Sequence, residues 1–186
     1  MKKIGIIGNG FVGNSIAFGF SPTHDIKIHD KDPKKNLNSI DEVLEYEFVF
    51  VAVPTPMNSD GSISLKIVEK ALQEISDKNK RNDNVIILKS TMVPGSTDNF
   101  IKKFPKLNIV FNPEFLTERT AKLDFLTQAR IILGGDAKFT NKVKKVFQER
   151  FMHCYIIEMD TITAEMIKYM NNVFFACKVS IMNEMK

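Results

Sequence analysis

The sequence predicts an α/β protein in which a doubly wound, mainly parallel sheet is followed by a long C-terminal helix. Short β-branched runs alternate with helical segments along the chain, and most of these runs are continuously apolar. Strands of that kind are buried on both faces, as in parallel sheets that helices cover on both sides. The predicted strands are 3–7, 26–29, 48–53, 85–89, 108–111, 130–133 and 155–157.

The helical segments are recognised by apolar residues at steps of three and four. One stripe precedes the fourth strand and a weaker one follows the sixth; their members are Leu65, Val68, Ala71, Leu72, Ile75, then Val143, Val146 and Phe147. The longest stripe begins near Thr161 and continues to Lys186 without a glycine, a proline or a cap signal. A helix this apolar needs a covering partner, so we expect a homodimer through it or cover from protein outside this sequence.

Length and composition describe one ordinary soluble globular domain. The chain has 186 residues, of which 44% are hydrophobic and 26% charged. No apolar stretch reaches the roughly 18 residues that a membrane helix needs, and no signal-peptide cleavage site follows the N-terminus. The net charge of +4 comes from dispersed lysines, whereas a nucleic-acid surface concentrates its basic residues on one face. We therefore expect no membrane and no nucleic-acid partner.

Cys154 and Cys177 are the two cysteines of the chain, and they lack the paired spacing of a metal site. A disulfide framework is not expected either, which makes a reducing cytoplasm the default compartment. Both cysteines are interpreted as small core residues, and no metal is predicted.

A glycine-rich loop follows the first predicted strand and opens a helix: Gly8-Asn9-Gly10-Phe11-Val12-Gly13. In a dinucleotide site the first glycine of such a loop makes a tight turn, and the second lets pyrophosphate approach the backbone. The third permits close packing of the helix, whose N-terminus faces the phosphates. The position between strand and helix makes the motif specific. It predicts a Rossmann-like nucleotide site.

Asp30 closes the second predicted strand, where a carboxylate accepts hydrogen bonds from the adenosine ribose and repels a 2′-phosphate. This favours NAD over NADP. Lys31, Lys34 and Lys35 follow closely and weaken the discrimination, because lysines can serve a phosphate. The alternative for Asp30 is a turn aspartate before Pro33.

Polar residues also follow the third and fourth predicted strands. Val53-Pro54-Thr55-Pro56 ends the third strand, and the prolines prevent its continuation. Ser90 and Thr91 end the fourth strand, where hydroxyls point into the ligand crevice of a parallel sheet. Either hydroxyl could equally cap the next helix.

Two carboxylates follow the fifth predicted strand, in the run Asn112-Pro113-Glu114-Phe115-Leu116-Thr117-Glu118. At the carboxyl end of a strand an acidic pair, here Glu114 and Glu118, can do proton chemistry or hold a polyhydroxyl ligand. The alternative is a helix N-terminus with Pro113 in its first turn and acids that suit the helix dipole.

Lys168 and Asn172 are four residues apart, so they project from one face of the last helix. A cation and an amide there can polarise an oxygen that develops negative charge, such as an alkoxide during hydride removal. The alternative is a solvated lysine paired with Glu165.

Taken in order, these motifs and the run Ala164-Glu165-Met166-Ile167-Lys168 resemble the UDP-glucose/GDP-mannose dehydrogenase family over almost the whole chain. Members oxidise the C6 alcohol of a nucleotide sugar to a carboxylate with two NAD+ in succession. The resemblance implies a NAD-binding Rossmann domain over 1–160 and the start of the central interdomain and dimerisation helix over 161–186. It also implies that the C-terminal nucleotide-binding domain is absent.

The resemblance further implies roles for individual residues. Thr91 would help to place a water, Glu114 would be the acid/base residue, and Lys168 with Asn172 would hold the reacting oxygen. The implied substrate contacts are Glu114, Phe115, Leu116, Glu118, Lys168 and Asn172. The implied NAD contacts are Gly8, Asn9, Gly10, Phe11, Val12, Gly13, Asp30, Lys35, Val53, Pro54, Thr55, Thr91 and Glu118.

The chain also departs from the family pattern. The family's cysteine nucleophile lies beyond the helix where this sequence ends, and Cys177 does not match its position. The stretch from Asp30 to Val53 is shorter than usual, and Thr117-Glu118-Arg119 stands where Arg-Glu-Gly is common. Two other functions therefore stay open: a non-catalytic NAD-binding module or enzyme remnant, and a β-hydroxyacid dehydrogenase. The acidic run counts against the latter, because a carboxylate substrate favours cations.

Overall fold

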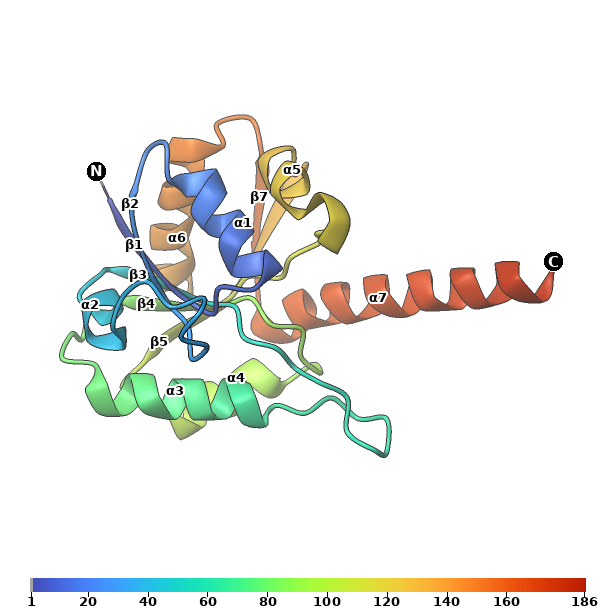
Figure 1. The fold of residues 1–186 in the computed structure, drawn as a ribbon, viewed down its shortest axis with the longest axis horizontal. Helices are drawn as coiled ribbons and strands as arrows, with labels where there is room; N and C mark the ends of the chain where they lie inside the picture. Colours follow the sequence, from blue (N-terminus) through green and yellow to red (C-terminus); the bar gives the residue numbers. More distant parts are fainter. Residues whose placement is uncertain (1) are drawn as a thin grey trace.

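The computed structural model describes residues 2–186, which form one seven-stranded sheet. Helices cover both faces of this sheet (Figure 1). The strand order is β2-β1-β3-β4-β5-β6-β7. The strands are β1 (Lys3–Ile7), β2 (Asp25–His29), β3 (Phe48–Val51), β4 (Val85–Leu88), β5 (Asn108–Phe111), β6 (Arg130–Gly134) and β7 (Tyr155–Met159). The helices are α1 (Phe11–Phe20), α2 (Ile40–Leu44), α3 (Lys66–Lys78), α4 (Ser96–Lys103), α5 (Ala121–Leu126), α6 (Ala137–Arg150) and α7 (Thr161–Glu184), with a 3-10 turn η1 (Glu118–Thr120).

The sheet is mainly parallel, which confirms the predicted fold class. The first five strands pair in parallel, and β6 joins them antiparallel through Phe111 and Gly134. β7 then pairs with β6 in parallel. All residues of β3 and β4 are buried, as expected for central strands that consist only of apolar residues. The reversal at β6 had no signal in the sequence.

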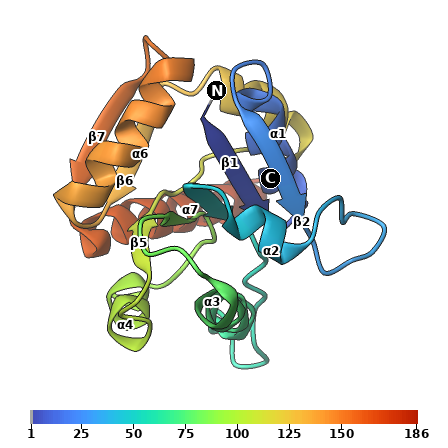
Figure 2. The same cartoon turned by 90° about the vertical axis from the view of Figure 1, so that its left-hand side faces the viewer.

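The helices form one layer on each face of the sheet (Figure 2). On one side α2, α3, α4 and the start of α7 pack on the sheet. On the other side α1, α5 and α6 enclose a cluster of aromatic rings, among them Phe20, Phe125 and Phe147. The shortened connection over 31–47 contains α2 and no strand; α2 begins at a capping box formed by Ser39 and Glu42.

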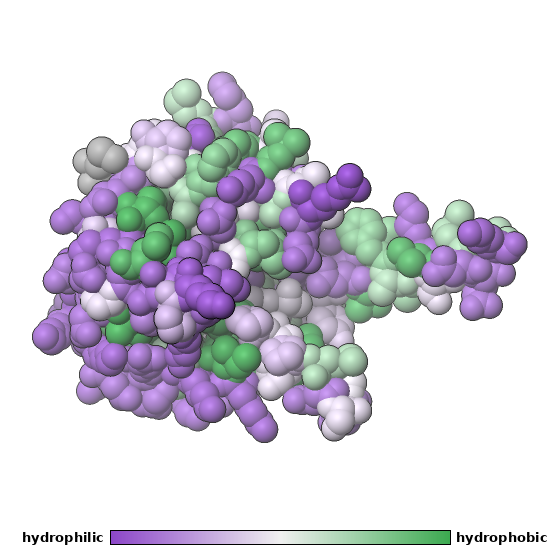
Figure 3. All heavy atoms as spheres, viewed as in Figure 1, coloured by the Kyte–Doolittle hydropathy of each residue, from purple (hydrophilic) through white to green (hydrophobic). Residues whose placement is uncertain are grey.

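α7 confirms the predicted long C-terminal helix, and most of it extends away from the sheet domain (Figures 1 and 3). Its buried residues belong to its first turns: Thr161, Ala164, Glu165 and Lys168. Beyond them the helix exposes large apolar side chains, including Phe174, Phe175 and Ile181. Cys177 is exposed on this part of the helix, so its interpretation as a core residue is wrong. No helix in residues 2–186 has the length and apolarity to span a membrane.

Candidate functional site

A cavity with a volume of about 480 Å³ lies at the carboxyl ends of β1, β3 and β4. Parallel strands end at the same edge of a sheet, so the loops after them converge there. The lining residues are Gly8, Gly10, Phe11, Val12, Asp30, Lys35, Ala52, Val53, Pro54, Thr55, Lys89, Ser90, Thr91 and Glu114. Most of the predicted cofactor contacts are in this set.

The glycine loop has the geometry that its spacing predicts. Gly8 has a φ of 99°, in the left-handed region that glycine favours. A Cβ on Gly13 would lie 1.9 Å from the carbonyl oxygen of Gly8, so α1 can pack this closely only on a glycine. A Cβ on Gly10 would have no neighbour within 4 Å. The backbone at Gly10 is therefore open to a ligand, and no side chain caps the N-terminus of α1.

Asp30 connects the glycine loop to the end of β2. Its Oδ2 accepts from the backbone N–H of Asn9 at 2.6 Å, and its Oδ1 accepts from that of Asp32 at 2.8 Å. Asp30 thus makes the turn contact of the alternative interpretation and also lines the cavity. The Asn9 side chain donates from Nδ2 to the carbonyl oxygen of Lys35 at 2.8 Å. This contact brings the first part of the 31–47 connection to the cavity.

The hydroxyls after β4 do not cap the next helix. Ser90 Oγ donates to the carbonyl oxygen of Val53 at 2.5 Å, which ties the ends of β3 and β4 together. The N-cap of α4 is Gly95, so the capping alternative for Ser90 and Thr91 is wrong. Thr91 is half-buried and lines the cavity beside Thr55.

Glu114 and Lys168 meet at the end of the cavity. Glu114 Oε1 lies 3.0 Å from Lys168 Nζ, and the two side chains are 11% and 6% exposed. Glu114 Oε2 accepts from the backbone N–H of Leu116 at 2.6 Å. Residues 112–117 form an extended loop and no helix begins at Pro113, so the helix N-terminus alternative is wrong.

Lys168 does not pair with Glu165. The Glu165 carboxylate is fully buried and accepts from the backbone N–H groups of Gly95 and Thr97 at 2.6 and 2.7 Å, and from Thr97 Oγ1 at 2.6 Å. Burial raises the pKa of Glu165. The alternative of a solvated Lys168–Glu165 pair is therefore wrong, because both side chains point into the domain.

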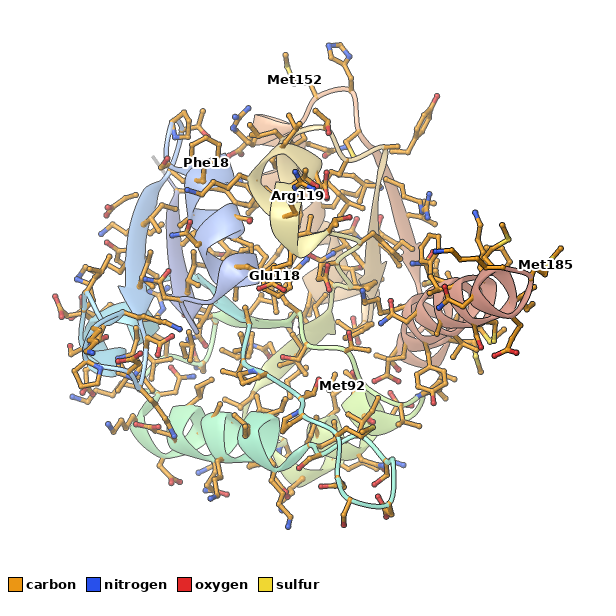
Figure 4. All side chains as sticks on the ribbon, turned by 45° about the vertical axis from the view of Figure 1, so that its right-hand side comes forward. Phe18, Met92, Glu118, Arg119, Met152 and Met185 are labelled. Carbon is orange, nitrogen blue, oxygen red and sulfur yellow. The ribbon has the colours of Figure 1, made fainter. Side chains whose placement is uncertain are left out.

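Four predicted substrate contacts lie differently from one another. Phe115 is half-buried, with Lys168 Nζ 5.6 Å and the Arg130 guanidinium 5.0 Å from its ring centre. Leu116 packs against the aromatic cluster of the other face. Glu118 is exposed on η1 and lines a second cavity beside the start of α1 (Figure 4). Asn172 is exposed one turn beyond Lys168. The structure thus gathers Glu114, Phe115 and Lys168, but not Glu118 or Asn172.

Lys89 belongs to the site, although it was not among the predicted site residues. Its side chain is 4% exposed, and Nζ donates to Asn112 Oδ1 at 2.8 Å and to the carbonyl oxygen of Pro113 at 3.3 Å. Burial lowers the pKa of Lys89 to about 7. The available signal was its position, since a lysine directly follows the apolar strand Val85–Leu88.

The residues of the cavity fit a dinucleotide. Open backbone at Gly10 and the uncapped N-terminus of α1 suit a phosphate, because helix N–H groups attract anions. The Asp30 carboxylate suits ribose hydroxyls. Among residues 2–186, no three His, Cys, Asp or Glu residues are grouped closely enough to hold a metal ion.

The model of the UDP-glucose/GDP-mannose dehydrogenase family, NAD binding domain, matches residues 37–151. UDP-glucose 6-dehydrogenase AglM of Haloferax volcanii is 30% identical, over 98% of this chain and 53% of the relative. The chain thus spans about half the length of this curated relative.

Two solved structures share the fold. A ternary complex of GDP-mannose dehydrogenase from Pseudomonas aeruginosa has a TM-score of 0.87 at 23% identity, over 99% of this chain and 52% of that one. A UDP-glucose dehydrogenase from Pyrobaculum islandicum has a TM-score of 0.85 at 25% identity, over 100% of this chain and 52% of that one.

Proposed function

Because the chain belongs to the UDP-glucose/GDP-mannose dehydrogenase family, whose NAD-binding domain it carries, we propose that it is the cofactor-binding half of a nucleotide-sugar 6-dehydrogenase. The reaction is the oxidation of the C6 alcohol towards the uronic acid, on a substrate of the UDP-glucose, UDP-N-acetylhexosamine or GDP-mannose type. The observation that carries the proposal is the Glu114–Lys168 contact of 3.0 Å at the end of the cavity that the glycine loop borders.

In this proposal the chain's own residues handle the proton and the charge of the alcohol. NAD+, when bound, supplies the acceptor for the hydride. The Lys168 ammonium donates to the C6 oxygen and stabilises the negative charge that develops there. The Glu114 carboxylate takes the hydroxyl proton, as a buried base within reach of the same oxygen can. Asp30 holds the adenosine ribose, and Thr91 helps to place a water.

A β-hydroxyacid substrate is disfavoured by the same contact. Lys168 already shares its charge with Glu114 at 3.0 Å, so the carboxylate of such a substrate would meet an anion beside the cation. A sugar hydroxyl meets no such repulsion. Comparing turnover on 3-hydroxy acids with turnover on nucleotide sugars separates the two functions.

A non-catalytic NAD-binding module is the second candidate. The observations that favour it are the shortened 31–47 connection, which contains α2 and no strand, and the exposed position of Cys177 on α7. This candidate predicts that NAD+ binds to the chain while no nucleotide sugar is oxidised in any assay.

The proposal extends to partners and compartment. A second copy of the chain would cover the apolar side chains that α7 exposes, which gives a homodimer. The compartment would be the cytoplasm, the default for a chain with two unpaired cysteines.

The test is NAD+ reduction, followed by absorbance, with UDP-glucose, UDP-N-acetylhexosamines and GDP-mannose. The purified chain is assayed alone and with the C-terminal half of a relative supplied in trans. We expect reduction with one substrate class, and a loss of at least about a hundredfold in Lys168→Met. Lys178→Met, an exposed lysine on the same helix, is the control. Absence of reduction with every substrate in both settings would contradict the proposal.

A further inference from the structure

Lys89 is a buried lysine that reaches from the end of β4 to the loop that carries Glu114. Its backbone N–H donates to Val51 at 2.9 Å, which continues the pairing of β3 and β4 by one residue. Its Nζ lies 2.8 Å from Asn112 Oδ1 and 3.3 Å from the carbonyl oxygen of Pro113. Both acceptors are neutral, so the buried Lys89 ammonium is hydrogen-bonded to an amide oxygen and a carbonyl oxygen, and to no carboxylate of residues 2–186.

Asn112 fixes the direction in which Lys89 is held. Its backbone N–H donates to Leu88 at 2.8 Å, and its side-chain Nδ2 donates to Ile132 at 2.7 Å. The amide nitrogen is therefore committed to β6, and its oxygen is left to face the ammonium. Lys89 thus bonds both residues that immediately precede Glu114 and restrains the loop there.

Two charged groups act on Lys89 from two different elements. Glu114, in the loop after β5, favours the charged ammonium, and Lys168, on α7, disfavours it. Burial is the larger effect and lowers the pKa of Lys89 to about 7. The three side chains form a cluster with a net charge of +1 when Lys89 is protonated and of zero when it is neutral.

We propose that Lys89 is a positioning residue of this site: it restrains the Asn112–Pro113 turn that presents Glu114 to Lys168, and its charge is coupled to that of the pair. Removal of the Lys89 amine would release the Pro113 carbonyl and let the Glu114 carboxylate leave its 3.0 Å contact with Lys168. The consequence for alcohol oxidation rests on the proposed function, whereas the restraint and the coupling do not.

The coupling is tested by NMR titration of the Lys89 side chain in protein labelled with 13C-lysine. Glu114→Gln removes the favourable charge and should lower the Lys89 midpoint, whereas Lys168→Met removes the unfavourable one and should raise it. The expected shifts are on the order of one pH unit. Lys102→Met, at an exposed position on α4, should leave the midpoint unchanged. An identical Lys89 midpoint in the wild type and in both site variants would overturn the coupling.

The restraint is tested by the backbone amide of Leu116, which donates to Glu114. Lys89→Met should shift this resonance and weaken its protection from hydrogen exchange, and Lys89→Arg should partly restore both. Unchanged Leu116 signals in Lys89→Met would overturn the positioning role. If Lys89→Met does not fold, the Leu116 signals of Lys89→Arg still test the restraint, and the titrations of Glu114→Gln and Lys168→Met still test the coupling. If the NMR results hold while no nucleotide sugar is oxidised, the proposed function fails and the role of Lys89 stands.

Discussion

Glu165 and Lys168 lie three residues apart on α7 and are buried on the same side of the helix, where each contacts a different part of the domain. Glu165 binds the N-terminus of α4 with three hydrogen bonds, and Lys168 contacts Glu114. Residues at this spacing are neighbours on a helix surface. The first contact therefore sets the position of α7 at which the second becomes possible, and it also holds the end of the loop that contains Thr91.

Glu165→Ala should destabilise the protein by about 3 kcal/mol. The substitution leaves the buried N–H groups of Gly95 and Thr97 without their acceptor, and each unsatisfied buried donor costs about 1–3 kcal/mol. Urea unfolding measures the change. Glu184→Ala, at the exposed end of the same helix, is the matched control. A change below about 1 kcal/mol in Glu165→Ala would show that the α4 contact does not fix α7.

Gly13→Ala should lower the stability of the protein, whereas Gly10→Ala should lower its affinity for NAD+. A methyl group at Gly13 meets the carbonyl oxygen of Gly8 at 1.9 Å, so overpacking should cost about 1–3 kcal/mol in urea unfolding. At Gly10 the methyl group enters open space, so stability should change little while NAD+ affinity falls. Equal stability of the two variants would contradict the packing of α1 against the glycine loop.

The stability of the protein should rise between pH 7 and pH 10 relative to that of Lys89→Met. The pKa of Lys89 is about 7 in the folded chain and has its ordinary value of 10.5 in the unfolded chain. Between these values the unfolded state binds more protons, so the free energy of unfolding increases with pH. The unfavourable contribution is fully present below pH 7. Urea unfolding at several pH values measures the difference, and parallel pH curves for the two proteins would exclude a lowered pKa.

α7 should mediate self-association. Its outer part exposes Phe174 and Phe175, at 62% and 53%, in a region that no other element of residues 2–186 covers (Figure 3). Light scattering after size exclusion should give the mass of a dimer, and Phe174→Lys with Phe175→Lys should give a monomer. Lys178→Glu is the control for a change of charge on the same helix. A strict wild-type monomer would contradict a homodimer through α7.

The sequence carried the parts of the site that depend on local spacing. The loop from Gly8 to Gly13 and the position of Asp30 follow from short-range patterns, whereas the local pattern at Lys168 left a solvated alternative open. The contact between Glu114 and Lys168 joins residues far apart in the chain, so only the packing of α7 on the sheet edge reveals it. Lys89 has no local pattern beyond its place after a strand, because its partners come from the next strand of the sheet.

Three other features of the structure differ from what the sequence predicts, and each has its cause in tertiary packing. Glu118 and Glu114 belong to one short run, but the extended loop ends at η1, which turns Glu118 towards the start of α1. Asn172 shares a helix face with Lys168, yet α7 has left the domain one turn earlier. The antiparallel entry of β6 rests on a single paired position, Phe111 with Gly134, and strand propensity does not encode direction.

Titration calorimetry of the purified chain with NAD+ and NADP+ tests the central claim, a NAD site built on the glycine loop and Asp30, most directly. We predict that NAD+ binds with one site per chain and at least about tenfold more tightly than NADP+, and that Asp30→Ala removes this preference. Asp60→Ala, on an exposed loop, should leave it intact. Absence of NAD+ binding, or equal affinity of the wild type for both nucleotides, would contradict the account.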